Sequence, residues 1–283
     1  MSQLAQLFQL DGDRKSRAAA ERLRPMFEQL APSDLVTAHL WLFASDWIAL
    51  PDGEKQDHKR HQETLAKERG RALEAVFKSL GWFGISRLAE EASEAGRVGW
   101  EVGKSSLAHE DITEWILDRQ RNVGWAKTNW VVQGLLAGMG GERRDATLDL
   151  VIKKLRDQGR QSEAPEFLIN APFMPDTWKR LESLDIKERD SYWSSVVPGF
   201  VRLDPEDMST AVEQLIKQGR ARSAFQLVMY EPEHVDPFVL KGLLEAIKSG
   251  AEPEGKLPEG WHIGKAIEAI AVSDQIPRRD LAI

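Results

Sequence analysis

Apolar residues recur along this chain at intervals of three and four positions, and the pattern breaks at regular points. One such stripe follows Asp145 and runs through Leu148, Val151, Ile152 and Leu155. This spacing places the apolar side chains on one face of a helix. We find no segment with the alternating pattern that is typical of a half-buried strand. The sequence therefore predicts an all-α fold.

Glycine marks the predicted ends of three helices, and an arginine follows each of these glycines. Glycine is favoured at a helix end because it adopts a left-handed conformation at little cost. The arginine after it is expected to cap carbonyl groups or to face solvent, and the alternative is a shared role in ligand binding. The pairs lie 63 and 60 residues apart, and they are Gly96-Arg97, Gly159-Arg160 and Gly219-Arg220.

The spacing of these pairs indicates an internal repeat. When the chain is shifted by 60 residues, apolar positions fall on apolar positions and turn residues on turn residues, for example Leu155 on Leu215 and Pro172 on Pro232. The first copy matches less well than the other two. We therefore expect a degenerate repeat at 83–125, clearer repeats at 126–187 and 188–250, and incomplete C-terminal helices at 258–283.

Repeats of this kind predict how the chain is organised. A single helical hairpin cannot cover both faces of its apolar stripe, so neighbouring hairpins stack on one another. We expect residues 1–283 to form one domain, a right-handed superhelix of stacked antiparallel helical hairpins.

The chain contains 10 tryptophans but only two tyrosines. Trp115 and Trp178 occupy equivalent repeat positions, which Phe238 takes in the third copy. Phenylalanine has no polar group, so the shared requirement is bulk, and core packing is expected at all three. Other tryptophans lie among polar residues and glycines and are candidates for exposure, namely Trp100, Trp125 and Trp261. The candidate groove residues are Arg97, Arg160, Arg220, Trp100 and Trp125.

Composition and charge narrow the functional classes. The chain has no cysteine, which excludes disulfides and thiolate chemistry and fits a reducing, cytoplasmic location. No segment has the length and hydropathy of a membrane span, so no membrane partner is expected. The formal net charge of −7 argues against nucleic-acid binding as the main function. The best local basic segment is His58-Lys59-Arg60-His61 with Lys67, Arg69 and Arg71, and acidic residues are interleaved with it.

Catalytic and cofactor motifs are missing from the sequence. The glycine-rich segment 138–141 lacks the preceding strand and the Lys-Ser/Thr ending of a phosphate-binding loop. His58 and His61 have a spacing that places two imidazoles on one helix face, but no third metal ligand accompanies them. We predict no catalytic, cofactor-binding or metal-binding residue.

Two stretches carry a resemblance to known proteins. They are Leu40-Trp41-Leu42-Phe43 with Trp47 and Leu50-Pro51, and Tyr192-Trp193 with Val196–Pro198 and the helix that ends at Gly219-Arg220. Residues 33–283 resemble the helical-repeat regions, similar to TPR and HEAT repeats, of very large bacterial proteins. Some of these regions are similar to the sensor arms of STAND-type NTPases and other phage-defence factors. The resemblance implies a recognition or scaffolding module and transfers no catalytic residue.

The leading hypothesis is a non-catalytic module that binds a protein or peptide on a concave face. The segment 276–283 reads as a helix start, so we expect the chain to be a fragment of a larger bacterial protein. An alternative is a glycan-processing enzyme built as an α/α toroid, which also repeats helical hairpins and is rich in tryptophan. A third possibility, nucleic-acid binding through HEAT-like helices, requires a basic stripe.

Overall fold

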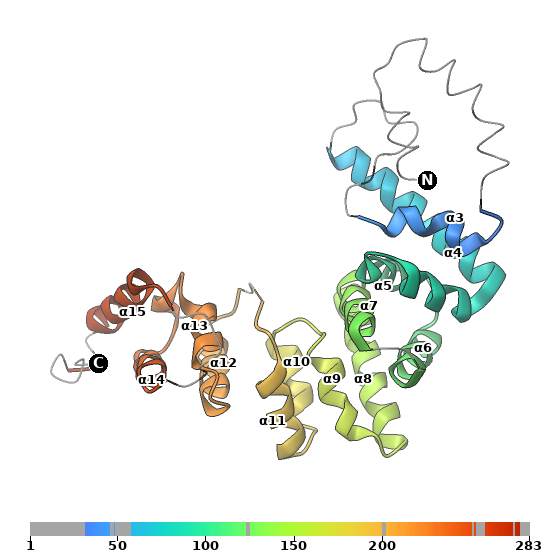
Figure 1. Ribbon diagram of the computed structural model, residues 1–283. Coiled ribbons are helices and arrows are strands. Elements are labelled where there is room, and N and C mark those ends of the chain that lie inside the picture. Colours follow the sequence, from blue (N-terminus) through green and yellow to red (C-terminus); the bar gives the residue numbers. More distant parts are fainter. Residues whose placement is uncertain are drawn as a thin grey trace, which may run out of the picture. The chain divides into compact units, whose positions relative to one another are not determined.

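The fold of the described residues is entirely helical, as predicted (Figure 1). The computed structural model describes residues 32–45, 48, 58–122, 125–199, 202–250, 252, 258–273 and 275–277. The helices gather into two compact units, Met1–Val151 and Ile152–Ile283, and the boundary lies inside a helix. The expectation of one continuous domain with the repeats at 83–125, 126–187 and 188–250 stays a prediction.

The first unit contains six helices in its described part, with the start of a seventh, and one short 3-10 helix. No helix in the described part of the chain combines the length and hydropathy that a membrane crossing requires. The elements are α3 (Leu35–His39), η1 (Leu40–Phe43), α4 (His58–Glu91), α5 (Ala95–Lys104), α6 (His109–Asn122), α7 (Trp125–Gly138) and the start of α8 (Gly141–Asp157).

Helices α5 and α7 approach each other so closely that their backbones touch. A Cβ atom added at Gly134 would lie 1.9 Å from the carbonyl oxygen of Gly96, and one at Gly99 would lie 2.0 Å from that of Val131. Later in both helices, a Cβ at Gly138 would lie 2.3 Å from the carbonyl oxygen of Trp100. Because the contacts advance in the same direction along both chains, the two helices run parallel.

The prediction that Gly96 ends a helix is wrong. Gly96 is the second residue of α5, and Arg97 therefore continues the helix instead of following it. The physical reason is the contact with α7, since a Cβ at Gly96 would lie 3.1 Å from the carbonyl oxygen of Trp130. Here glycine is required by close packing of two backbones and not by a left-handed turn.

Cationic side chains from later in the chain cap the carbonyl ends of earlier helices in this unit. Arg143 donates to the carbonyl oxygens of Gly103, Ser105 and Leu107, which follow or end α5. Lys127 donates in the same way to Glu90 and Ala92 at the end of α4. The last carbonyls of a helix have no partner within it, so these bonds satisfy groups that would otherwise be left open.

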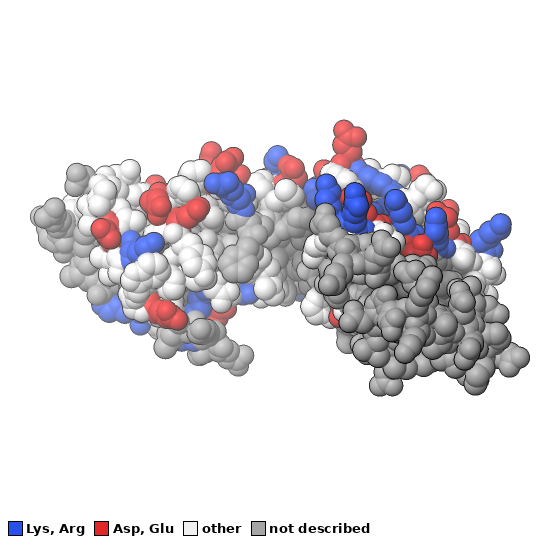
Figure 2. Space-filling model, turned by 90° about the horizontal axis from the view of Figure 1, so that it is seen from above, with Lys and Arg blue, Asp and Glu red and all other residues white. Residues whose placement is uncertain are grey.

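The predicted basic segment of α4 is interrupted in the same way. Arg69 is only 2% exposed and donates to the carbonyl oxygens of Leu42 and Ser45, both at 2.7 Å. His61 is also buried, so neither residue contributes to a basic surface. The exposed part of the segment mixes Lys67 and Arg71 with exposed glutamates, and Figure 2 shows basic side chains interspersed with acidic ones on the face it displays.

Glu101 is the buried carboxylate of α5 and is 5% exposed. Burial raises the pKa of this carboxyl group above its ordinary value, and the nearby charges of Lys104, Arg69 and Arg97 oppose the shift. The Lys104 ammonium lies 3.8 Å from the carboxylate. Desolvation therefore outweighs the attraction of three cations at this position.

We expect the raised pKa of Glu101 to make the folded state less stable as the pH rises. The folded state holds the proton more tightly than the unfolded chain, whose carboxyl titrates near 4.5. Stability is therefore lost as the pH rises from about 4.5 through the folded pKa. In urea titrations between pH 4 and pH 8, the unfolding free energy of Glu101→Gln should gain on that of the wild type as the pH increases. A difference that does not change with pH would contradict the assignment.

The second unit begins within α8 and contains shorter helices and two 3-10 turns. In sequence, α12, α13 and α14 pack against one another, and α15 packs against α14 (Figure 1). The elements are η2 (Gln161–Glu163), α9 (Ala164–Leu168), α10 (Pro175–Leu181), α11 (Ile186–Ser195), α12 (Pro205–Lys217), α13 (Ala221–Val228), η3 (Pro232–His234), α14 (Pro237–Lys248) and α15 (Gly260–Val272).

The two remaining Gly-Arg pairs end helices as predicted. Gly159 and Gly219 have φ of +66° and +71°. The amide of Arg160 donates to the carbonyl of Leu155 at 2.7 Å, and the amide of Arg220 donates to that of Leu215 at 2.9 Å. This is the six-to-one bond of a Schellman motif, present in the same form 60 residues apart. The local turn is therefore the same at both places.

Tryptophan packing agrees with the sequence at two of the three equivalent positions. Trp115 and Trp178 are 5% and 9% exposed, and Trp178 packs beside Phe173 and Trp193 in an aromatic core. Phe238 is 60% exposed, so the prediction of core packing there is wrong. The reason is the helix start: Phe238 is the second residue of α14, whereas Trp178 is the fourth residue of α10.

Candidate functional site

The predicted groove residues belong to different parts of the structure. Arg97 and Trp100 are half-buried in α5, and Trp125 is the first residue of α7, with its side chain outside the described part. Arg160 and Arg220 belong to the second unit. Binding of a ligand by these five residues stays a prediction, although the arginines of the second unit have structural partners.

Arg220 shows the carbonyl-capping role that the sequence offered as one alternative. One guanidinium nitrogen donates to the carbonyls of Trp193 and Val196, at 3.0 and 2.6 Å, beyond the end of α11. A second donates to the Ser223 hydroxyl, and the Glu252 carboxylate lies 3.9 Å away. Burial lowers the pKa of Arg220 below its usual range, and Glu252 opposes the shift.

Arg160 occupies the equivalent position but has different partners. Its guanidinium donates to both carboxylate oxygens of Glu163, at 2.7 and 2.6 Å, and to the side chain of Gln158. All of these printed contacts are with residues two or three positions away in the sequence. Arg160 therefore braces its own turn, whereas Arg220 joins its turn to α11.

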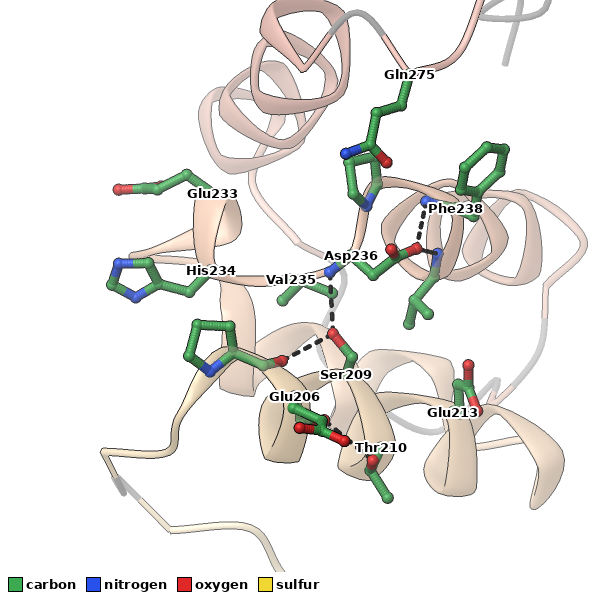
Figure 3. A pocket seen from close by; sticks show the side chains of 13 residues that line it. Glu206, Ser209, Thr210, Glu213, Glu233, His234, Val235, Asp236, Phe238 and Gln275 are labelled. Carbon is green, nitrogen blue, oxygen red and sulfur yellow. Dashed lines mark hydrogen bonds between the residues drawn. The ribbon is translucent and has the colours of Figure 1, made fainter.

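The larger of the two hollows described in the second unit lies between the start of α12, the η3 turn and the start of α14 (Figure 3). Its volume is about 590 Å³, and we call it the acidic groove. It is lined by Pro205, Glu206, Ser209, Thr210, Glu213, Glu233, His234, Val235, Asp236, Pro237, Phe238, Val239 and Gln275.

Hydrogen bonds among the lining residues fix the shape of the acidic groove. The Asp236 carboxylate accepts from the amides of Phe238 and Val239, at 2.9 and 3.2 Å, and so caps the start of α14. The Asp236 amide in turn donates to the Ser209 hydroxyl, which donates to the carbonyl of Pro205 (Figure 3). This chain of bonds ties η3 and α14 to α12 across 27 residues of sequence.

The charge of the acidic groove has one sign. Four of its lining residues are carboxylates, and none is lysine or arginine. Glu206, Glu213 and Glu233 are exposed, and the ring of Phe238 is 60% exposed at the edge of the groove. The imidazole of His234 lies 3.1 Å from the carboxylate of Glu231, outside the lining. The groove thus offers negative charge beside one large apolar ring.

The groove has no arrangement that indicates catalysis. The Ser209 hydroxyl gives its proton to a backbone carbonyl, and the Thr210 hydroxyl does the same at 3.0 Å, so both serve as structural donors. Within the described residues, no group of three or more His, Cys, Asp or Glu side chains is placed to hold a metal ion. The chemistry that the groove does offer is attraction of cations.

A second hollow of about 380 Å³ lies between α13, the segment after α11 and the start of α15. We call it the aromatic hollow. It is lined by Pro198, Gly199, Arg222, Phe225, Gln226, Met229, Tyr230, Pro258, Glu259 and His262. The rings of Tyr230 and His262 meet edge to face with centroids 5.7 Å apart.

Sequence reasoning did not find the acidic groove. It identified the carboxylates at the start of α12 but interpreted them as a helix start, and it did not single out Glu233. Each turn has a local signal, because Pro205, Pro232 and Pro237 stand at the first positions of their helices. No local signal shows that the two turns meet.

No protein family, curated protein or solved structure shows a significant match to this chain. The functional argument therefore rests on the groove and its charges.

Proposed function

We propose that this chain is a non-catalytic helical-repeat module that recognises a protein or peptide partner, with the acidic groove as its binding site. The observation that carries the proposal is the lining of the groove, which combines four carboxylates, no basic residue and the exposed ring of Phe238. A hollow of this size suits a few residues of a partner chain rather than a large flat surface.

The chemistry of the groove favours a basic peptide segment with a neighbouring apolar side chain. Lysine or arginine side chains of the partner would pair with Glu206, Glu213 and Glu233, while the apolar side chain would pack on Phe238. Asp236 is committed to capping α14, so it contributes field rather than a pairing group. Exposed ion pairs are individually weak, so the apolar contact is needed for affinity and the charges set specificity and association rate.

We further propose that the helices form a superhelix of stacked hairpins in a larger cytoplasmic protein of bacterial origin. The support comes from α5 and α7, which run parallel with α6 between them in sequence, as equivalent helices of neighbouring hairpins do. The identical turns at Gly159 and Gly219 add to it. In such an arrangement the chain would supply recognition and other domains the chemistry.

The test is fluorescence anisotropy with labelled peptides of about ten residues that combine arginines with one phenylalanine. The triple variant Glu206→Gln/Glu213→Gln/Glu233→Gln should bind about tenfold more weakly, since three exposed pairs contribute about 0.5 kcal/mol each. Phe238→Ser should weaken binding at every salt concentration, whereas the effect of the glutamates should fade in high salt.

A matched control replaces three exposed glutamates outside the groove, Glu110, Glu142 and Glu182, with glutamine. This variant carries the same change in net charge and should bind like the wild type. Equal loss of binding in both triple variants would mean that overall charge attracts the peptides, and the groove would no longer be their site.

A further inference from the structure

The last described helix presents an apolar face that nothing in the described structure covers. α15 buries Ala266 and Ile270 and packs against α14 and η3. On its other side, Trp261 is 61% exposed and Val272 is 75% exposed. Large apolar side chains exposed in this way on one helix are a mark of an interaction surface.

These exposed residues form a continuous stripe along the helix. At 100° per residue, positions three, four, seven and eleven apart fall on one face. The outer stripe of α15 consists of Trp261, Gly264, Lys265, Glu268 and Val272. It lies opposite the buried Ala266 and Ile270, and it reads as apolar ends, a charged centre and one glycine.

The stripe is complementary to itself when it is reversed. A twofold axis that passes between Ala266 and Ile267 pairs Trp261 with Val272 of a second copy. The same axis pairs Lys265 with Glu268 of the second copy, and it does each of these twice. An aromatic ring therefore meets an aliphatic side chain at both ends, and opposite charges meet on both sides of the centre.

We infer that α15 forms an antiparallel pair with α15 of a second copy of this chain. Gly264 lies close to the axis and lets the two backbones approach there. Lys265 now lies over the ring of Trp261, with the ammonium 4.5 Å from its centroid, and it reaches Glu268 of the second copy by a change of side-chain rotamer. The pair is isologous, so it closes as a dimer and does not propagate.

The aromatic hollow extends this surface. The ring of Trp261 contacts that of His262 with centroids 4.7 Å apart, and His262 contacts Tyr230, which is 56% exposed. Val272 of the second copy reaches the helix at Trp261, beside these rings. Because one helix pair is still small compared with a standard interface, we expect a dissociation constant on the order of 100 µM.

The first experiment is sedimentation equilibrium of the whole chain over a wide range of concentration. The charge reversals Lys265→Glu and Glu268→Lys each place like charges opposite one another twice, so each should weaken dimerisation about tenfold. The double variant Lys265→Glu/Glu268→Lys restores the opposite charges and should dimerise within about threefold of the wild type. Val272→Asp changes a residue that is 75% exposed in the monomer, so it should abolish the dimer without unfolding the chain.

The control is Lys248→Glu, the same charge change at an exposed position of α14, and it should dimerise like the wild type. A chain that remains monomeric up to about 1 mM would overturn the inference. Dimerisation that is unaffected by Val272→Asp would overturn it as well, because the contact would then lie elsewhere.

The direction of the helices can be tested by cross-linking, since the chain has no cysteine of its own. When Lys265→Cys and Glu268→Cys chains are mixed under oxidising conditions, the antiparallel pair predicts disulfides between the two variants. A parallel pair predicts disulfides within each variant and would overturn the proposed register. The binding of basic peptides at the acidic groove is measured separately, so failure of one proposal leaves the other standing.

Discussion

Replacing Gly134 with alanine should destabilise the first unit by about 3 kcal/mol or more. The added Cβ would lie 1.9 Å from the carbonyl oxygen of Gly96 and 2.9 Å from its Cα atom. Both are backbone atoms of α5, so relief requires that whole helices move apart. The melting temperature of the unit, followed by circular dichroism, should fall by about 6–12 °C.

The matched control is Gly70→Ala, which makes the same change inside α4. A Cβ at Gly70 would meet nothing within 4 Å. Alanine there gains helix propensity, so the variant should be more stable by about 0.5–1 kcal/mol. Opposite signs for one substitution in two helices would identify backbone contact as the cause. If Gly134→Ala were as stable as the wild type, α5 and α7 would not approach as described.

Replacing Arg220 with methionine should destabilise the second unit by about 2–4 kcal/mol. The carbonyls of Trp193 and Val196 would lose their donor, and Glu252 would lose the cation that lies 3.9 Å from it. Methionine keeps most of the aliphatic volume, so the loss reports the polar contacts. Urea denaturation followed by tryptophan fluorescence measures the change.

The same substitution at Arg160 separates a structural role from a binding role. Its printed partners lie within three residues of it, so Arg160→Met should cost about 1 kcal/mol or less. If both arginines served ligand binding instead, the two variants would lose affinity for a partner together and lose little stability. A small effect of Arg220→Met on unfolding would show that its carbonyl contacts contribute little.

The all-helical fold and the turns at Gly159 and Gly219 follow from local signals. Apolar spacing determines which face of a segment is buried, and a glycine after the last apolar position ends the helix. Gly96 has the same local context, yet its role depends on α7, which lies more than 30 residues later. The signal that separates it was present, because Gly99 and Gly103, and Gly134 and Gly138, each have a four-residue spacing. Such a spacing favours close helix contact.

Phe238 shows a different limit of sequence reasoning. Matching by repeat register assumes that equivalent residues lie at equivalent depths of their helices. Asp236 caps α14 immediately before Pro237, so the helix starts later relative to its aromatic residue than α10 does. The two-residue difference changes which face the ring joins. The acidic groove depended on the same cap, which is why neither feature could be read from composition or spacing alone.

The carbonyl caps have a consequence for synthesis of the chain. In each case the donor lies downstream: Arg69 serves η1, Lys127 serves α4, Arg143 serves α5 and Arg220 serves α11, with separations of 24 to 40 residues. A helix emerging from the ribosome therefore stays open at its end until the next stretch has followed it. Folding of the nascent chain is thereby given a direction, from the N-terminus onward, with each new segment completing the one before.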